Sequence, residues 1–265
     1  MSKKESKLHK KICRLLKQLN FGRFLHHFGP KKFTLVQHLV ALLLKETCRL
    51  SFRRVENIFG IFDIKVPTYS ALCKSRKRIP PSLWTSLLQL TCGLEHEKIA
   101  VDGTGFSRTN PSFHYIKRIC RRKLIKSYAK LSALFDIDMR KFCALRIRTK
   151  PRHDIQDVNY LMNRVGKMKS LYADTAYDAE SLHEICFKKN VQTFIKPRKN
   201  VRRGFYRKKQ MKNYSEQEYH QRSLIEAGFG ALKRKYGGSV SGRGIVSVKS
   251  EIFCKAIYHN LSLIN

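Results

Sequence analysis

The sequence changes character near residue 97, and this change limits the possible folds more than any other feature. Residues 1–95 carry helical patterns only, including amphipathic stretches over 34–45 and 51–59. Beyond them, short apolar runs alternate with helical segments. We therefore predict an all-helical N-terminal region, 1–95, followed by a mixed α/β domain, 96–265.

Five apolar runs in the second region have the length and composition of strands, at 98–104, 130–137, 142–149, 170–174 and 191–195. The second and third runs are close enough to form a hairpin around Asp138-Met139-Arg140. Helical patterns interrupt or follow the later runs, at 154–165, 179–189 and 218–236. Three antiparallel strands followed by parallel additions predict a mixed five-stranded sheet with helices on both faces.

The chain is strongly basic. It carries 55 Lys and Arg against 19 Asp and Glu, a formal net charge of +36, while hydrophobic residues make up 42%. That much apolar sequence can bury a core, which argues against global disorder, and a metabolic enzyme needs no field of this size. Two stretches without an acid, 103–135 and 185–215, indicate contact with a nucleic-acid backbone rather than a solvated surface alone. The second stretch supplies five candidate DNA contacts: Arg202, Arg203, Arg207, Lys208 and Lys209.

A further basic cluster lies in the helical region. Pro67-Thr68 precedes a predicted helix over 69–79, and Ser82 is the expected cap of the next helix. Two short helices followed by a basic one resemble a helix-turn-helix DNA reader. The connection at 60–66 is longer than that motif normally has, so another helical arrangement stays open. The basic helix carries four candidate DNA contacts: Lys74, Arg76, Lys77 and Arg78.

The cysteines and the N-terminus indicate the compartment. The 8 Cys are scattered singly, without a Cys-x-x-Cys pair, so we expect free thiols in a reducing compartment rather than disulfides or a zinc site. Residues 1–17 form a Lys-rich polar pattern without the apolar core of a signal peptide. The longest apolar run, 39–44, is far too short to span a membrane. We expect a cytoplasmic protein without a membrane partner.

In so basic a chain, isolated acids at the ends of apolar strands are the most informative residues. Asp102 follows Ile99-Ala-Val and precedes Gly103-Thr-Gly105, and Asp174 follows Leu171-Tyr-Ala. A strand end presents its side chain at the rim of the sheet, and neighbouring strands would bring these two carboxylates together. Adjacent carboxylates repel one another, and a hard divalent cation with oxygen ligands is what normally holds them ionised.

A turn or a helix N-cap is the alternative interpretation for any single acid in such a position. We keep that interpretation for Asp154 and Asp178, because each precedes a predicted helix. The hairpin turn accounts for Asp136 and Asp138, although Asp136 becomes a substitute site residue if the strand order differs.

Glu226 is the third informative acid, because it stands alone between residues 219 and 250 on a helix rich in bases. At about 100° per residue it shares one narrow stripe with Tyr219, Arg222 and Lys233. The opposite side carries smaller and apolar residues: Leu224, Ala227, Gly228, Ala231 and Leu232. An ordinary amphipathic helix explains the bases on the stripe but not the single acid among them.

These residues carry a resemblance. Tyr219-x2-Arg222-x3-Glu226-x6-Lys233 matches, without a gap or substitution, the Tyr-Arg-Glu-Lys signature of DDE transposases from prokaryotic insertion sequences. Val101-Asp-Gly-Thr-Gly-Phe106 resembles the first-Asp strand of that family, and Ala173-Asp-Thr-Ala-Tyr-Asp178 resembles its second-Asp motif. Pro67-Thr-Tyr-Ser-Ala-Leu72 is similar to the N-terminal region of many members. The resemblance covers essentially the whole chain and implies a ribonuclease-H-like catalytic fold.

The resemblance also implies the chemistry. Asp102, Asp174 and Glu226 would form the catalytic triad and bind two Mg²⁺ ions, for which Mn²⁺ can substitute. In two-metal phosphodiester chemistry we assign Asp102 as the bridging ligand, Asp174 as ligand to one ion and Glu226 as ligand to the other. The expected reaction hydrolyses the ends of the element to free a 3′-OH, which then attacks target DNA. Three further residues are expected to contact this DNA: Tyr219, Arg222 and Lys233.

Double-stranded DNA is the partner that the resemblance implies, as terminal inverted repeats and as target, bound by a homodimer or a higher synaptic complex at the prokaryotic nucleoid. The basic insertion at about 197–217 is short, so the DNA-hairpin route of members with a large β insertion there is not implied. Three alternatives stay open: a DNA-binding protein without catalysis (a repressor or a domesticated transposase), an RNA-binding or ribosome-associated protein, and another metal-dependent nuclease on the same fold.

Overall fold

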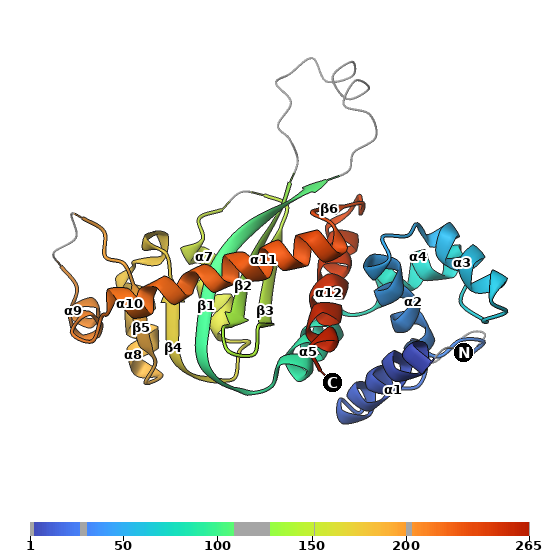
Figure 1. Ribbon diagram of the computed structural model, residues 1–265, viewed down its shortest axis with the longest axis horizontal. Coiled ribbons are helices and arrows are strands. Elements are labelled where there is room, and N and C mark those ends of the chain that lie inside the picture. Colours follow the sequence, from blue (N-terminus) through green and yellow to red (C-terminus); the bar gives the residue numbers. More distant parts are fainter. Residues whose placement is uncertain (1–2, 27–30, 109–127, 151, 200–202, 265) are drawn as a thin grey trace, which may run out of the picture.

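The structure is a computed structural model that describes residues 3–26, 31–108, 128–150, 152–199 and 203–264. A helical N-terminal part leads into a mixed sheet covered by helices (Figure 1). Among the described residues, no helix is long and apolar enough to cross a membrane.

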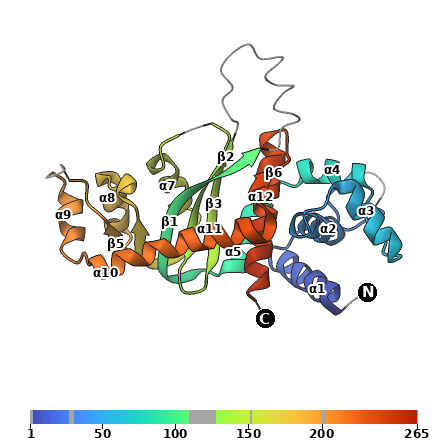
Figure 2. The ribbon, with the colours of Figure 1, turned by 45° about the horizontal axis from the view of Figure 1, so that its top comes forward.

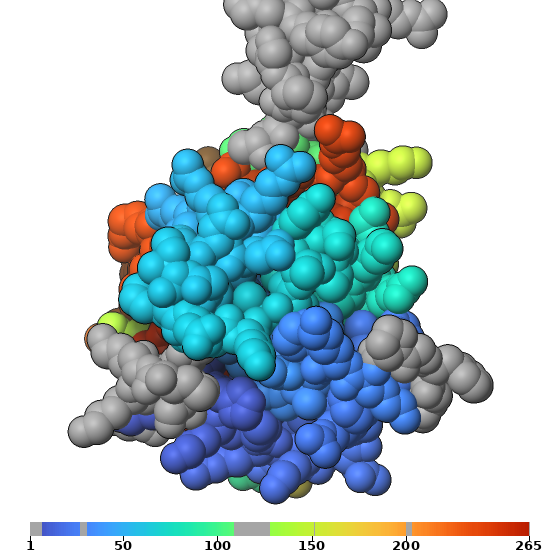
Figure 3. All heavy atoms as spheres, turned by 90° about the vertical axis from the view of Figure 1, so that its right-hand side faces the viewer, coloured from blue at the N-terminus to red at the C-terminus, as the bar shows by residue number. Residues whose placement is uncertain are grey.

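The N-terminal part consists of five helices, which confirms the helical pattern expected for it: α1 (Lys3–Gln18), α2 (Leu35–Thr47), α3 (Phe52–Ile61), α4 (Tyr69–Arg78) and α5 (Pro81–Cys92). Thr34, Ser51 and Thr68 cap α2, α3 and α4, each accepting a hydrogen bond from a backbone N–H in the first turn. The expected cap at Ser82 is wrong, because α5 begins at Pro81 with Pro80 in the cap position. Helices α1 to α4 form one end of the molecule (Figure 3).

Within the described residues the sheet contains six strands: β1 (Glu95–Arg108), β2 (Tyr128–Asp136), β3 (Lys141–Arg148), β4 (Lys167–Ala173), β5 (Gln192–Ile195) and β6 (Ser239–Val240). Its order is β3-β2-β1-β4-β5, and the short β6 pairs with the far end of β1. The first three strands are antiparallel, whereas β4 and β5 run parallel to β1. The mixed sheet is confirmed, with one more strand than the five expected.

Strand β1 is longer than expected, and this corrects the position of Asp102. The sequence predicts a run over 98–104 with Asp102 near its end, but the strand continues to Arg108, so Asp102 lies in its interior. The two glycines do not end the strand because Gly103 pairs with Ser132 and Gly105 with Lys130 in the antiparallel ladder to β2.

Helices cover both faces of the sheet, and alternate residues of β1 feed the two cores. Ile99 and Val101 pack with apolar residues of α7 (Ile155–Met162) and α8 (Glu180–Lys188). Ala100 and Phe106 belong to the other core, which continues through α5, α11 (Ser223–Tyr236) and α12 (Ile245–Ser262) into α1 and α2. The N-terminal helices therefore share an apolar core with one face of the sheet (Figure 2).

The helix expected over 218–236 is broken. It consists of α10 (Glu216–Tyr219), a 3-10 turn η2 (His220–Arg222) and α11, which ends as expected at Gly237, where φ is 85°. Short helices precede it at η1 (Thr175–Tyr177) and α9 (Phe205–Met211). The expected apolar side is also shifted, because Leu224 is exposed, whereas Ile225 and Phe229 are buried.

Candidate active site

Asp102 and Asp174 lie on neighbouring strands at the same level. In the parallel ladder between β1 and β4, Val101 pairs with Ala173; Asp102 is the next residue of β1, and Asp174 directly follows the end of β4. The backbone N–H of the following residue orients each carboxylate: Gly103 donates to Asp102 Oδ1 at 2.7 Å, and Thr175 donates to Asp174 Oδ1 at 2.6 Å. The second oxygen of each carboxylate is therefore the one available to a ligand.

Glu226 reaches the same place from a different element. Helix α11 runs across one face of the sheet, over β1 and β2 (Figure 1). Glu226 lies in its first turn, and its side chain is 55% exposed and able to change rotamer.

Arg222 lies among the three acids. Its Nη1 is 2.9 Å from Glu226 Oε1 and 4.0 Å from Asp102 Oδ2, so these two oxygens are no farther apart than the sum of the two distances. Burial works to lower the pKa of Arg222, but Glu226, Tyr219, Asp174 and Asp102 raise it overall. All three predicted acids thus act on one guanidinium group.

The pKa of Asp102 is raised by burial and by neighbouring carboxylates. Burial raises the pKa of Asp102, and the carboxylates of Glu226 and Asp154 add to the rise. The N–H of Gly103 and the charge of Arg222 oppose it without cancelling it. A bound cation would stabilise the ionised form of these carboxylates, and their oxygen atoms are the ligands that a hard divalent cation prefers.

Asp154 occupies the N-cap position of α7, as expected, but its side chain makes no capping hydrogen bond. Its Oδ1 instead forms an ion pair of 2.6 Å with Lys130, and a Cβ built on Gly103 would lie 2.8 Å from the same oxygen. Asp154 therefore lies against β1 beside Asp102, as a fourth carboxylate that sequence reasoning missed.

Tyr177 is a second residue that the sequence did not single out, although it stands in the second-Asp motif. Its side chain is buried, and its hydroxyl has no hydrogen-bond partner within the described part of the chain. Burial raises the pKa of Tyr177, and the carboxylates of Asp154, Asp102, Asp157 and Asp174 raise it further. The tyrosine is thus a buried residue whose hydroxyl lies within the electrostatic influence of Asp102 and Asp174.

The three predicted acids are near one another but not closed into a cage. Within the described ranges, the set of three potential metal ligands whose atoms all lie within 4.8 Å of one another is a different one, Cys92, His96 and Cys143. Glu226 is held by Arg222, and its exposed side chain can rotate inwards once that ion pair opens. Asp102, Asp174 and Glu226 can therefore hold a divalent cation once Glu226 has turned towards the two aspartates.

Tyr219 and Lys233, two of the predicted DNA contacts, have partners inside the protein. Tyr219 is only 8% exposed, and its ring lies 5.9 Å from the guanidinium carbon of Arg222. Lys233 donates to Thr104 Oγ1 on β1 at 2.6 Å, and burial lowers its pKa. The ring of Tyr219 therefore faces Arg222 and is largely covered by the protein.

The two basic clusters are split by burial. Arg76 is 8% exposed and bonds Glu251 at 2.7 Å, and Arg207 is 8% exposed and bonds Asp178 at 2.6 Å, so both guanidinium groups are paired inside the protein rather than free at its surface. Arg202 lies outside the described residues. The remaining predicted contacts of the two clusters are exposed: Lys74, Lys77, Arg78, Arg203, Lys208 and Lys209.

Two other acids have structural partners. Asp178 does not cap α8. It instead accepts hydrogen bonds from Arg207, from His183 and from the backbone N–H of Arg198, which together hold its pKa below the usual range although burial works to raise it. Asp136 accepts from the Met139 N–H in the hairpin turn, as expected.

Comparison with known proteins places this geometry in context. Residues 93–261 match the sequence model of the family described as the transposase DDE domain. No curated protein matches the chain. Among solved structures, the chain is similar to piggyBac transposase in a synaptic complex with hairpin DNA, with 11% identity and a TM-score of 0.47 over 97% of this chain and 73% of that one.

Proposed function

The chain belongs to the family of DDE transposases, and from this premise we propose that it cuts the ends of an insertion sequence and joins the freed 3′-OH to target DNA. The observation that carries the proposal is that Arg222 lies near both Asp102 and Glu226, while the register of β1 and β4 places Asp174 level with Asp102. These three acids are the proposed catalytic residues of a ribonuclease-H-like domain.

Members of this family use divalent metal ions, and we propose two Mg²⁺ ions held by the three acids, with Mn²⁺ as a substitute. When bound, the ions would activate the attacking oxygen and stabilise the leaving oxygen at phosphorus. Asp102 and Asp174 are oriented in advance, since the next backbone N–H fixes one oxygen of each. Glu226 joins them by leaving Arg222.

Arg222 then has a new role. A guanidinium released from Glu226 can pair bidentately with a phosphate beside the scissile bond. Tyr219 limits where Arg222 can move, and the bond from Lys233 to Thr104 holds a second positive charge close to Asp102 on the same strand. These two bases are therefore proposed to place the phosphate against the acids.

DNA binding is proposed to use both basic clusters. Lys74, Lys77 and Arg78 on α4 would contact the element's end from the N-terminal helices, proposed as a separate recognition region over 1–95. Arg203 precedes α9 by two residues, and Lys208 and Lys209 belong to this helix. Helix α9 lies at the end of the sheet opposite the N-terminal helices (Figure 1). A homodimer or higher synaptic complex, holding both ends of the element, is the proposed assembly.

The test is cleavage of a labelled duplex that carries the element's terminal repeat, with Mg²⁺ present. Asp102→Asn, Asp174→Asn and Glu226→Gln should each reduce cleavage by roughly a hundredfold or more, since several kcal/mol of transition-state stabilisation are lost, while binding persists. Glu184→Gln is the matched control, because the side chain of Glu184 is 38% exposed and, within the described part of the chain, its ion pair is with Lys188 on the same helix α8. Equal cleavage by a triad variant and the wild type refutes the site. Binding without any wild-type cleavage indicates a non-catalytic DNA-binding protein.

A further inference from the structure

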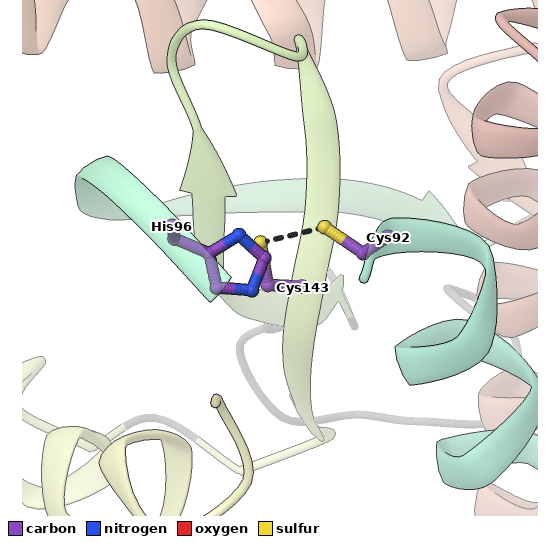
Figure 4. A group of neighbouring side chains, drawn as sticks. All are labelled: Cys92, His96 and Cys143. Carbon is purple, nitrogen blue, oxygen red and sulfur yellow. Dashed lines mark hydrogen bonds between the residues drawn. The ribbon is translucent and has the colours of Figure 1, made fainter. Parts of the chain in front are cut away.

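A second cluster of ligand-type side chains lies away from the three acids. Cys92 at the end of α5, His96 near the start of β1 and Cys143 in β3 gather in the interior (Figure 4). A ring nitrogen of His96 and the two sulfurs all lie within 4.8 Å of one another, and the sulfurs are 2.9 Å apart. All three residues are buried.

The surroundings of His96 resemble those of a metal ligand. Its Nδ1 lies 2.7 Å from Asp136 Oδ2, and its side chain is 1% exposed. Its Nε2 is buried and has no hydrogen-bond partner among the residues that the structure describes. Metal-binding histidines almost always use one nitrogen for the ion and donate the other N–H to a carboxylate or carbonyl. An unpaired buried nitrogen is otherwise costly.

We propose that Cys92, His96 and Cys143 bind one Zn²⁺ ion, with Asp136 holding the imidazole. Two thiolates and a neutral imidazole favour zinc or a similar soft divalent ion, whereas Mg²⁺ requires oxygen ligands. Binding releases two protons, one from each thiol, because the thiolate is the ligand. The charges of the ion and the two thiolates cancel, so the buried site carries no net charge from these groups.

The geometry requires a small adjustment. With Zn–S bonds of about 2.3 Å, tetrahedral coordination places two sulfurs about 3.8 Å apart. The two sulfurs are now 2.9 Å apart, so they must separate by about 0.9 Å. A pocket of about 800 Å³ that is also lined by Met162 and Met168 reaches His96.

The ion would fasten the helical part to the sheet. Cys92 ends α5, and His96 and Cys143 belong to β1 and β3, so one ion connects three elements. His96 precedes Asp102 by six residues on β1, about 20 Å along an extended strand, so this site is separate from the proposed catalytic one. Because the cysteines are scattered singly along the sequence, the sequence predicts free thiols. The cluster becomes visible only when Cys143 of β3 is seen beside Cys92 in the structure.

The test measures zinc in the full chain carrying Asp102→Asn, Asp174→Asn and Glu226→Gln, which removes competing carboxylate ligands. Purified under reducing conditions with Mg²⁺ in the buffer, this chain should retain one zinc per molecule by plasma mass spectrometry. Adding Cys92→Ser and Cys143→Ser should lower the content at least tenfold. Cys186→Ser is the matched control, since Cys186 is equally buried but outside the cluster, and it should keep the ion.

Anaerobic titration of the metal-free chain with Co²⁺ decides the matter if the double serine variant does not fold. Thiolate-to-cobalt charge-transfer absorption and release of two protons support the proposal. Asp136→Asn should weaken metal affinity about 10- to 100-fold. The proposal is overturned if the chain shows no such absorption and no zinc, or if Cys186→Ser loses as much zinc as the double variant. It is also overturned if the chain purified with reductant still carries a Cys92–Cys143 disulfide in place of the two thiols.

Discussion

Gly228 of α11 lies so close to Phe135 in β2 that a Cβ at Gly228 would stand 2.7 Å from two carbons of the ring. Gly228 is two residues beyond Glu226, so this contact sets how closely the helix approaches the sheet. The proposed catalytic glutamate therefore depends on the absence of a side chain one half-turn away.

Gly228→Ala should test this dependence. The added methyl group pushes α11 away from β2, and overpacking of this kind costs about 1–3 kcal/mol. We expect the free energy of unfolding to fall by that amount in urea titrations, and cleavage to fall further because Glu226 moves with the helix. Gly230→Ala is the control on the same helix, since its Cβ would meet only the flexible Arg234, at 3.4 Å. That variant should be stabilised by up to about 1 kcal/mol, and equal losses in both variants would contradict the argument.

The sequence predicts those parts of the fold that local patterns determine. Capping residues such as Thr34 and Ser51 mark helix starts because their side chains bond to N–H groups in the next turn. From the sequence alone, the two glycines beside Thr104 indicate the end of a strand. In the structure they stay extended because they pair with β2, and this pairing cannot be read from the local sequence.

Site residues can be predicted from the sequence when their residue type is unusual in its local context. They cannot be predicted when their role depends on a partner that is distant in the sequence. Glu226 stands out as a lone acid among bases, which is a local signal. Asp154 is indistinguishable from a helix cap until β1 is seen against α7. Arg76 and Arg207 look like surface bases because Glu251 and Asp178, their partners, are distant in sequence.

Asp102→Asn should stabilise the metal-free protein. The raised pKa of Asp102 means that the fold disfavours the ionised carboxylate, so a neutral amide removes that cost. We expect the free energy of unfolding to rise by about 1 kcal/mol and Tm to rise by roughly 2–4 °C in buffer with a chelator. Added Mg²⁺ should then raise the Tm of the wild type but not of the variant. A lower Tm for Asp102→Asn in chelator would count against charge crowding at this site.

Acid should destabilise the protein below about pH 6.5. Burial lowers the pKa of His183, and Arg207 adds to this, although Asp178 opposes it; burial likewise lowers the pKa of His38 and His259. Below the ordinary histidine pKa the unfolded chain binds protons that the fold does not, so the free energy of unfolding decreases as pH falls.

Urea unfolding at pH 7, 6 and 5 measures this effect, with a slope of up to about 1.4 kcal/mol per pH unit for each histidine. His183→Gln should reduce the slope, and the exposed His220→Gln should not. Below about pH 4, Asp178 acts in the same direction, because its lowered pKa gives stability that is lost as the carboxylate is protonated. A flat pH dependence in the wild type would exclude neutral buried histidines.

Arg76→Ala and Lys77→Ala should separate folding from DNA binding on α4. Glu251 is buried and accepts hydrogen bonds from Arg76 and from Ser241, so removing Arg76 leaves a buried carboxylate without its cation. Breaking such a pair costs about 3–5 kcal/mol, which chemical denaturation measures. Lys77 is exposed, and its loss should leave stability within about 0.5 kcal/mol of the wild type but weaken duplex binding. The reverse pattern would contradict the assignment of Arg76 to the interior.

Lys208 and Lys209 should contribute to the salt dependence of DNA binding, whereas Arg207 should not do so directly. Both lysines are exposed on α9, and Lys209 is held over the ring of Phe205, 4.6 Å from its centre. Each phosphate contact contributes about 0.9 to the slope of log K against log salt for duplex DNA. The double variant Lys208→Ala/Lys209→Ala should therefore lower the slope by about 1.8 with unchanged Tm. Arg207→Ala should lower Tm instead, because it removes the ion pair with Asp178, and an unchanged slope in the lysine variant would remove α9 from the DNA interface.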